Sequence, residues 1–246
     1  MQPTQLLDAA ECGDSAAALS LLQSGASASA ASSTGETALM KAARGGHPDV
    51  VQCLLSHGAL AETRESINGS SALMLAAAAG HSACVAHLLA AHASPSETDA
   101  NGRSPLLNAA TNGHDKALAL LLGASTSASG ADVADEAGRT PLIAAASAGA
   151  LACVELCLAA SASIYARDVT DATALHVAAQ GGHLDVAHAL LRAGARADVR
   201  DTEGNMPVDV ATDDSMRDVL AAALDDQYEH FSEKSYDSAQ DDRPWH

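Results

Sequence analysis

The chain repeats one pattern of apolar and polar positions at an almost constant spacing. The clearest mark of each unit is a small hydroxyl residue, then alanine or proline, then an aliphatic residue. These triplets begin at Thr37, Ser71, Ser104, Thr140 and Thr173, and a degenerate sixth begins at Met206. The intervals between them are 34, 33, 36, 33 and 33 residues. Self-similarity at this period predicts a stack of repeated units rather than one thick core.

Each unit also keeps the same internal order. An alanine pair follows the triplet, a Gly-His step follows the alanines in most units, and a leucine pair follows seven and eight residues later. The hydroxyl residue can cap a first helix, and the glycine can end it in a left-handed conformation. The leucines fit the buried face of a second helix. We therefore predict a helix, a tight turn, a second helix and an extended finger in every unit.

Four of these units resemble ankyrin repeats in detail. The matching strings are TALMKAARGGH, SALMLAAAAGH, SPLLNAATNGH and TALHVAAQGGH. The resemblance implies an all-α repeat solenoid, a stack of helix–turn–helix units with β-turn fingers. We expect about seven repeats over residues 1–224, of which the first and the last are caps with polar outer faces.

Two departures from the ankyrin pattern stand out. Only the sixth unit has the histidine that the family places after the leucine, at His176. We expect weaker hydrogen bonding between finger and helix in the units with Met40, Met74, Leu107 or Ile143 there. The fourth unit also has three extra residues in a serine-rich finger at residues 125–130. This finger is either a contact loop or a result of loop-length drift.

Composition agrees with thin helical layers. Apolar residues make up 48% of the chain but aromatic residues only 2%, so large rings cannot supply a thick core. The formal charge of −18 argues against nucleic acid and anionic membrane surfaces as partners and favours basic partners. Five cysteines without framework spacing, and no basic-then-apolar leader, suggest reduced thiols in a cytoplasmic protein, with the nucleus also open.

No motif of catalysis or cofactor binding is present. The sequence lacks a phosphate-binding glycine loop, a zinc-protease motif and a nucleophile elbow, so we expect no enzyme activity and no cofactor. The Gly-His histidines recur with the turn and are not expected to bind metal. Cys153 and Cys157, four residues apart on one helix, could form a soft-metal or redox pair, but their positions favour packing in the core.

The resemblance places partner contacts on the fingers and just after the alanine pairs. The candidates are Arg44, Asn68, Asn101, Arg103, Asn112, Arg139, Gln180 and Asn205. Arg103 and Arg139 hold equivalent positions on neighbouring fingers and could bind an acidic segment together. Alternatively, each arginine pairs with a nearby carboxylate, such as Asp99 or Asp135. We interpret the turn aspartates Asp99, Asp135, Asp168 and Asp201 as acceptors of finger backbone hydrogen bonds.

The repeat pattern ends near residue 224 and an acidic tail follows. Residues 225–246 contain four of the five aromatic residues, namely Tyr228, Phe231, Tyr236 and Trp245. We expect this tail to be disordered when free. Tyr228, Phe231 and Trp245 either anchor a partner or fold back onto the last repeat.

Together these features predict a protein-interaction scaffold or adaptor, monomeric on its own. The expected partner is another protein, either basic or carrying an acidic segment for Arg103 and Arg139. The alternative is a regulatory subunit or module of an enzyme complex that has no chemistry of its own.

Overall fold

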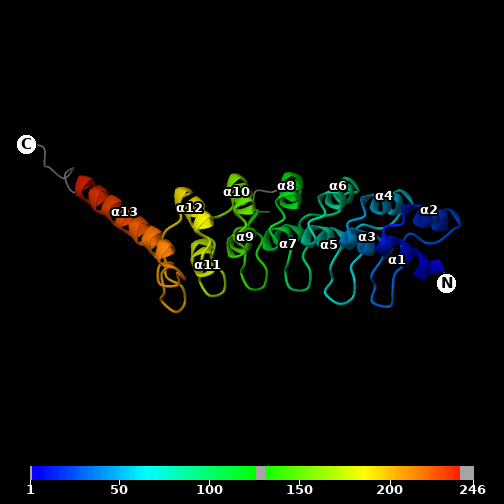
Figure 1. The fold of residues 1–246 in the computed structure, drawn as a ribbon, viewed down its shortest axis with the longest axis horizontal. Coiled ribbons are helices and arrows are strands. Elements are labelled where there is room, and N and C mark those ends of the chain that lie inside the picture. The colour runs from blue at the N-terminus through cyan, green and yellow to red at the C-terminus, as the bar shows by residue number, and fades with distance from the viewer. Residues whose placement is uncertain (1, 126–130, 239–246) are drawn as a thin grey trace, which may run out of the picture.

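A computed structural model describes residues 2–125 and 131–238, and it contains six helix pairs followed by one long helix. The helices are α1 (Gln2–Cys12), α2 (Ser15–Gln23), α3 (Ala38–Gly45), α4 (Pro48–Ser56), α5 (Ala72–Ala78), α6 (Ser82–Ala90), α7 (Pro105–Thr111), α8 (Asp115–Ala124), α9 (Pro141–Ser147), α10 (Leu151–Ala159), α11 (Ala174–Gly181), α12 (Leu184–Arg192) and α13 (Asp214–Ser238). We call α1, α3, α5, α7, α9 and α11 the first helices. Their partners α2, α4, α6, α8, α10 and α12 are the second helices. Both sets form parallel rows along one stack (Figure 1).

The first helices begin at the predicted hydroxyl caps. The side-chain oxygens of Thr37, Ser71, Ser104 and Thr140 accept backbone N–H bonds from the residue three positions later, at 3.1–3.4 Å. These bonds satisfy donors that a helix start otherwise leaves without a partner. The α3 helix ends at Gly46, whose φ of +73° is the left-handed conformation that the Gly-His step predicted.

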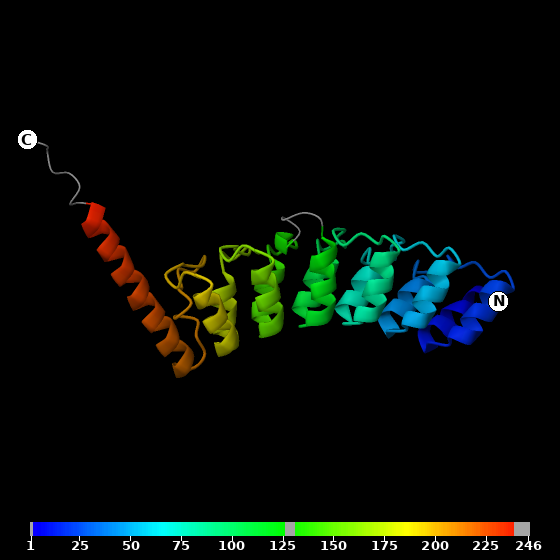
Figure 2. The same cartoon turned by 90° about the horizontal axis from the view of Figure 1, so that it is seen from above.

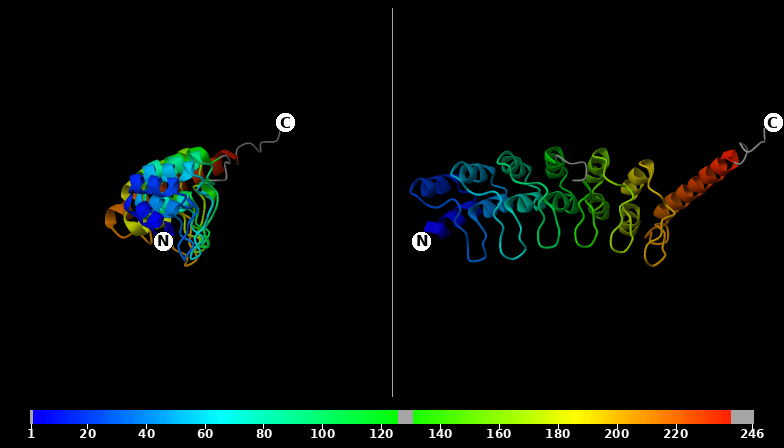
Figure 3. Two further views of the ribbon diagram at one scale, coloured as in Figure 1. Left: turned by 90° about the vertical axis from the view of Figure 1, so that its right-hand side faces the viewer. Right: turned by 180° about the vertical axis from the view of Figure 1, so that it is seen from behind.

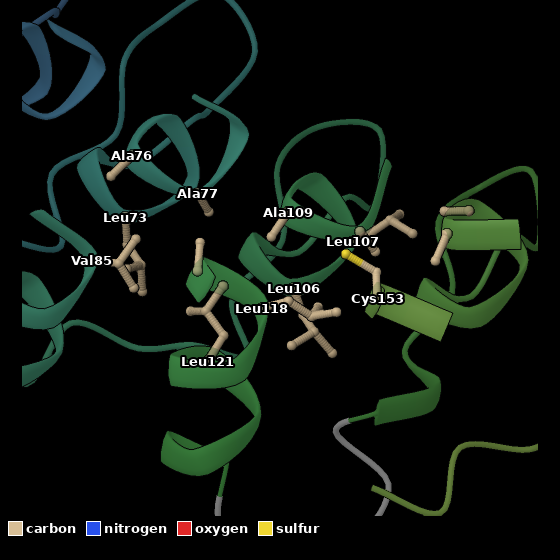
Figure 4. Close-up of a cluster of buried hydrophobic side chains, with 14 of the residues drawn as sticks. Leu73, Ala76, Ala77, Val85, Leu106, Leu107, Ala109, Leu118, Leu121 and Cys153 are labelled. Carbon is tan, nitrogen blue, oxygen red and sulfur yellow. The ribbon is translucent and has the colours of Figure 1, made fainter. Parts of the chain in front are cut away.

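One hydrophobic core runs through the whole stack, from Leu6 to Leu220. Each first helix packs mainly on its own second helix and on the first helices before and after it. Leucines and alanines of neighbouring units share this core, as Figure 4 shows in the middle of the stack for Ala77 of α5 and for Leu106 and Ala109 of α7. Small alanines let neighbouring helices approach closely, so thin units can still reach native packing density. The predicted solenoid is confirmed.

We call each connection from a second helix to the next first helix a finger. Fingers 1 to 6 cover residues 24–37, 57–71, 91–104, 125–140, 160–173 and 193–206. All six extend to the same side of the stack (Figure 3). The serine-rich segment of finger 4 that contains the extra residues, at 126–130, lies outside the described residues.

A carboxylate or hydroxyl closes the turn of every finger. Asp99, Asp135, Asp168 and Asp201 each accept two backbone N–H bonds from residues two and four positions later, at 2.8–3.0 Å. In finger 2 the Glu65 carboxylate instead accepts from the N–H groups of Ile67 and Asn68, both at 2.7 Å. In finger 1 the Ser32 hydroxyl accepts from the N–H groups two and four positions later. The structural interpretation of the turn aspartates is therefore confirmed.

Neighbouring fingers are joined by backbone hydrogen bonds close to their tips. The N–H groups of Ser66, Ala100, Glu136, Val169 and Thr202 each donate to a carbonyl of the preceding finger, at 2.8–3.2 Å. The six fingers therefore form one continuous edge rather than six independent loops.

The recurring histidines join one unit to the previous one. His47, His81, His114 and His183 each place Nε2 3.0–3.2 Å from a backbone oxygen of the preceding first helix or its end. The His81 ring also covers Gly46, where a β-carbon would lie 2.5 Å from ring atoms. The histidines therefore fix the spacing between units.

The ends of the stack differ from its middle. The seventh unit has a turn at residues 207–210 in place of a first helix. Its second helix, α13, runs through the predicted boundary at residue 224 and leads away from the stack (Figure 2). The Gln227 side chain ties α13 to finger 6, accepting from Ala197 N and donating to Ala195 O at 3.0 Å.

Candidate partner-binding face

The fingers and the exposed ends of the first helices share one side of each unit. In the second unit, Glu36 Oε1 on finger 1 lies 2.6 Å from Arg44 Nη1 on α3, and Glu36 Oε2 lies 4.0 Å from Lys41 Nζ. Because the units repeat, each finger stands beside the same positions of the following first helix. We call this surface the finger face.

Arg139 on finger 4 is held in a fixed orientation. Its Nε and Nη2 donate to Asp135 Oδ2 at 3.0 and 2.7 Å, a two-bond pairing of guanidinium and carboxylate. The Asp135 side chain is only 3% exposed, whereas 45% of the Arg139 side chain remains exposed. The second edge of the guanidinium is therefore available for another acceptor.

Asp135 stays ionised although it is buried. Burial by itself raises the pKa of this carboxyl, but the Arg139 side chain and the two turn N–H groups outweigh burial and lower the pKa. The Asp135–Arg139 pair is thus a preorganised group whose charge is stable over the physiological pH range.

Arg103 holds the equivalent position on finger 3 but is less constrained. Its Nε lies 3.9 Å from Asp99 Oδ2, and 45% of its side chain is exposed. The alternative of pairing with a turn aspartate therefore holds firmly for Arg139 and only weakly for Arg103.

The first helices beneath these two arginines carry no formal charge. The helices α5, α7, α9 and α11 contain no Asp, Glu, Lys or Arg. Their exposed ends present small or neutral polar residues, namely Thr111, Asn112, Ser147, Ala148 and Gln180. Charge on the middle of the finger face therefore comes from the fingers.

The other predicted contacts differ in availability. Asn68 and Asn101 are exposed at fingertips, and their carbonyls accept the bonds between fingers. Asn112 and Gln180 are exposed at first-helix ends, where Asn112 Nδ2 donates to Asn108 O at 2.9 Å.

The side chains of Asn205 and Arg44 already have partners within the chain. Asn205 is half-buried, its Nδ2 faces Asp201 and Glu203 at 3.3 Å, and its carbonyl lies 3.2 Å from His176 Nε2. That last contact is the bond between finger and helix expected at the sixth unit. Arg44 belongs to the charge cluster with Glu36.

The N-terminal end of the finger face is a network of ion pairs. Lys41 Nζ donates to Glu11 Oε2 at 2.5 Å, which links α3 to α1. This bond raises the pKa of Lys41 and lowers the pKa of Glu11. With Arg44 paired to Glu36, the charges of this end largely cancel.

Four exposed apolar side chains on the described parts of the fingers were not predicted from the sequence. Leu60 and Ile67 in finger 2 are 65% and 70% exposed, and Tyr165 and Val169 in finger 5 are 63% and 68% exposed. Each stands where most other units have a polar or small residue, so comparing the units position by position could have found them.

The remaining candidates lie partly beyond the described side chains. Tyr228 and Phe231 belong to α13, and only their backbone is described. Trp245 lies outside the described residues. Their roles stay predictions.

The cysteine pair is buried in the core, as favoured from the sequence. Burial raises the pKa of Cys153 to about 11 and that of Cys157 to about 12. Such thiols stay protonated and are poor nucleophiles. Among residues 2–125 and 131–238, no group of three or more His, Cys, Asp or Glu could hold a metal ion, and no helix is long and apolar enough to cross a bilayer.

Comparison with known proteins gives the same architecture. A family model described as "Ankyrin repeats (3 copies)" matches residues 6–99, 73–168 and 106–201. The chain is similar to the human ASB11 ankyrin repeat domain, with a TM-score of 0.81 and 28% identity over 89% of this chain and 96% of that one. It is also similar to the ankyrin repeat domain of Bcl-3, described as a unique member of the IkappaB protein family, with a TM-score of 0.74 and 26% identity over 88% of this chain and 97% of that one.

Two curated relatives match a shorter segment. Both are named "Cyclin-dependent kinase 4 inhibitor B", from Bos taurus and Homo sapiens, and each is 53% identical over 45 residues. This segment is 18% of this chain and 34% and 33% of the two relatives, so it spans about a third of their length.

Proposed function

Because the chain belongs to the ankyrin-repeat family, whose repeats are protein-interaction modules, we propose that it is a monomeric scaffold or adaptor that holds a partner protein on its finger face. The carrying observation is the pair Arg103 and Arg139, at equivalent positions on neighbouring fingers above uncharged helices. The five free thiols suit a reducing compartment, and we expect the chain to act in the cytoplasm.

The partner segment offers carboxylates to the two arginines. Adjacent units stack about 10 Å apart, so we expect the two guanidinium groups to lie about one such step from each other. A polyproline-type segment advances about 9 Å in three residues and returns to the same side. Acidic residues at positions i and i+3 of such a segment therefore match the spacing.

The rest of the segment is neutral or basic. Net charge of −18 on this chain repels a uniformly acidic partner at long range. The fingertip carboxylates of Glu136 and Glu203, both exposed, favour basic groups near the acidic pair. This arrangement sets the register of the bound segment.

Direct binding of designed peptides tests this function. The probe is a fluorescent proline-rich peptide with glutamates at i and i+3, and anisotropy measures its affinity. We expect Arg103→Glu with Arg139→Glu to weaken binding by roughly tenfold or more, because two charge-assisted contacts become repulsive.

A matched variant controls for net charge. Lys116 and Arg192 are exposed on the second helices α8 and α12, away from the finger face. The double change Lys116→Glu with Arg192→Glu alters total charge equally and should leave affinity within about twofold. Equal loss in both double variants, or equal binding of a peptide with scrambled glutamate spacing, would exclude this site.

A further inference from the structure

One joint between successive helix pairs lacks the histidine that bridges the others. The other joints are bridged by the rings of His47, His81, His114 and His183. The corresponding residue of the fifth unit is Ala150. Its methyl group cannot donate to Thr111 O, which is the counterpart of the carbonyls that the histidines contact. The pair α7 and α8 is therefore joined to the pair α9 and α10 without this bridge.

The fourth unit nevertheless keeps the surface on which such a ring would lie. Gly113 has a left-handed φ of 70°, close to the 75° of Gly80 in the preceding unit. A β-carbon at Gly80 would lie 2.6 Å from the His114 ring, whereas the nearest neighbour of one at Gly113 is the Ala150 β-carbon at 3.4 Å. An imidazole at position 150 would therefore meet the same glycine turn as at the other joints.

A clamp between fingers is also missing at this joint. Arg64 Nη1 on finger 2 donates to Thr98 O on finger 3 at 2.5 Å. Arg167 Nη1 on finger 5 lies 3.5 Å from Arg200 O on finger 6 in the same way. The residue of finger 3 that corresponds to Arg64 is Thr98, whose side chain is too short to make this contact with finger 4.

Hydrogen bonding across this joint is correspondingly sparse. Among the described residues of fingers 3 and 4 and of helices α7 to α10, one hydrogen bond and no ion pair cross it. This bond runs from Glu136 N to Asn101 O and, at 3.2 Å, is the longest of the five bonds between fingertips. The joints on either side also have a carboxylate, of Glu62 or Asp132, that accepts an N–H of the next finger at 2.8 Å.

Apolar packing supplies most of the attraction across this joint. Leu107 of α7 and Cys153 of α10 belong to the same buried cluster (Figure 4). Burial of apolar surface is non-directional, so it opposes separation of the helix pairs more than small rotations of one pair on the other. Hydrogen bonds are directional and fix orientation, and here they are few. The joint should therefore bend without coming apart.

We propose that the joint between the pair α7 and α8 and the pair α9 and α10 is a hinge of the stack. Arg103 and Arg139 lie on its two sides, on the fingers that lead into α7 and α9. Their separation therefore changes as the hinge bends, which adjusts the finger face to carboxylates at different spacings. Bending is a property of the free chain, so the hinge does not depend on the partner proposed for these arginines.

Hydrogen exchange of fingertip amides, measured by NMR on the full chain without a partner, tests the hinge. The N–H groups of Ala100, Glu136 and Val169 make the same bond at three successive joints. Their exchange rates are corrected for the intrinsic rate of each sequence. We expect Glu136 to be protected about fivefold less than Ala100 and Val169, because its bond opens more often where the stack bends.

A histidine at position 150 should stiffen this joint. We expect Ala150→His to bring the protection of Glu136 to within about twofold of that of Ala100, because the added ring reaches Thr111 O. The matched control is Ala152→His, which adds the same ring at an exposed position of α10 and should leave Glu136 unchanged.

Removing a histidine should create a second soft joint. His81→Ala leaves the bond from Ser66 N to Thr34 O as the one hydrogen bond between the described residues of its two units. We expect Ser66 to lose about fivefold of its protection in this variant.

The comparison within the unchanged chain is decisive on its own. Equal protection of Glu136, Ala100 and Val169 would overturn the hinge. It would also be overturned by a folded Ala150→His variant in which Glu136 gains no protection, or by an equal gain in Ala152→His. Circular dichroism shows which variants are folded.

Discussion

Two exposed turn residues adopt a backbone conformation that glycine has elsewhere. Ser161 and His92 have φ values of 62° and 63°, and their counterparts Gly58 and Gly194 have 84° and 95°. In every case the next N–H returns to the preceding second helix, so the motif is the same. A β-carbon in this region costs roughly 1–2 kcal/mol. The backbone is therefore strained at Ser161 and His92, although the turn itself is the one that the other units share.

Ser161→Gly should stabilise the protein. Relief of strain exceeds the entropy that glycine adds to the unfolded chain, so we expect a gain of about 0.5–1 kcal/mol. Urea denaturation measures it as a higher midpoint. Ala159→Gly, two residues earlier at the exposed end of α10, should lower the midpoint instead. A lower midpoint for Ser161→Gly would show that its hydroxyl, rather than strain, dominates.

The turn carboxylate Asp135 makes stability depend on pH. Its folded pKa is lowered below the value of about 3.9 expected in the unfolded chain. A lowered folded pKa contributes stability that is present above pH 3.9 and is lost as pH falls through the folded value. Acid should therefore loosen finger 4.

Asp135→Asn should be less stable than the unchanged chain by about 1–2 kcal/mol at neutral pH, because charge-assisted bonds are lost. The difference should shrink steadily below about pH 4. Urea titrations across this range measure it. Asp226→Asn, at an exposed position of α13, serves as the control and should change little. A difference that stayed constant with pH would exclude the carboxylate as its source.

At the scale of an element, the distance between units is set where the histidine of one unit contacts the glycine that ends the first helix of the preceding unit. Gly46 and Gly58 both have left-handed φ values, 73° and 84°. A β-carbon at Gly46 would meet the His81 ring at 2.5 Å, whereas nothing lies within 4 Å of one at Gly58. Comparing alanine substitutions at Gly46 and Gly58 therefore separates the cost of backbone strain from the cost of a clash with the histidine ring.

We expect Gly58→Ala to cost about 1 kcal/mol from strain alone, and Gly46→Ala to cost about 1–3 kcal/mol more from overpacking. Denaturation midpoints of the two variants measure this difference. Adding His81→Ala to Gly46→Ala should relieve part of the loss, as a double-mutant cycle would detect. Equal costs for both glycines would mean that the ring moves aside freely.

Elements that are determined by residues a few positions apart could be predicted from the sequence. Thr37 and Ser71 cap helices because their own hydroxyls reach the backbone three residues later, and Gly46 ends α3 through its own φ. The continuation of α13 past residue 224 could not be read this way. Its acidic residues lack the repeat pattern, but a helix already nucleated on Met216 and Leu220 can propagate through residues 225–238, because propagation is less costly than nucleation and no Gly or Pro interrupts this stretch.

The candidate site was predictable only in part, for a related reason. The equivalence of Arg103 and Arg139 follows from the repeat. Their unequal pairing, at 3.9 Å and 2.7 Å, depends on side-chain rotamers that the surroundings select.

At the scale of the whole molecule, each unit depends mainly on its neighbours. Leu220 of α13 is fully buried against the last helix pair. We expect Leu220→Ala to destabilise that end by about 2–4 kcal/mol through the cavity it leaves. Nearest-neighbour coupling should confine the effect.

Hydrogen exchange measures this confinement. Amides of α11 and α12 should exchange faster in Leu220→Ala, while those of α3 and α4 should keep their protection. Ala222→Ser, at an exposed position two residues on, is the matched control and should change neither. Faster exchange along the whole stack would show that the repeats unfold as a single cooperative unit.

The bonds between neighbouring fingers also have a mechanical consequence. Each joint between units combines a helix interface with a backbone hydrogen bond near the fingertips, so tension along the stack loads the joints in series. Extension then concentrates at the softest joint, and units should detach one after another rather than together. A segment bound across Arg103 and Arg139 would splint the joint between fingers 3 and 4, and the stack would bend less there than anywhere else along its length.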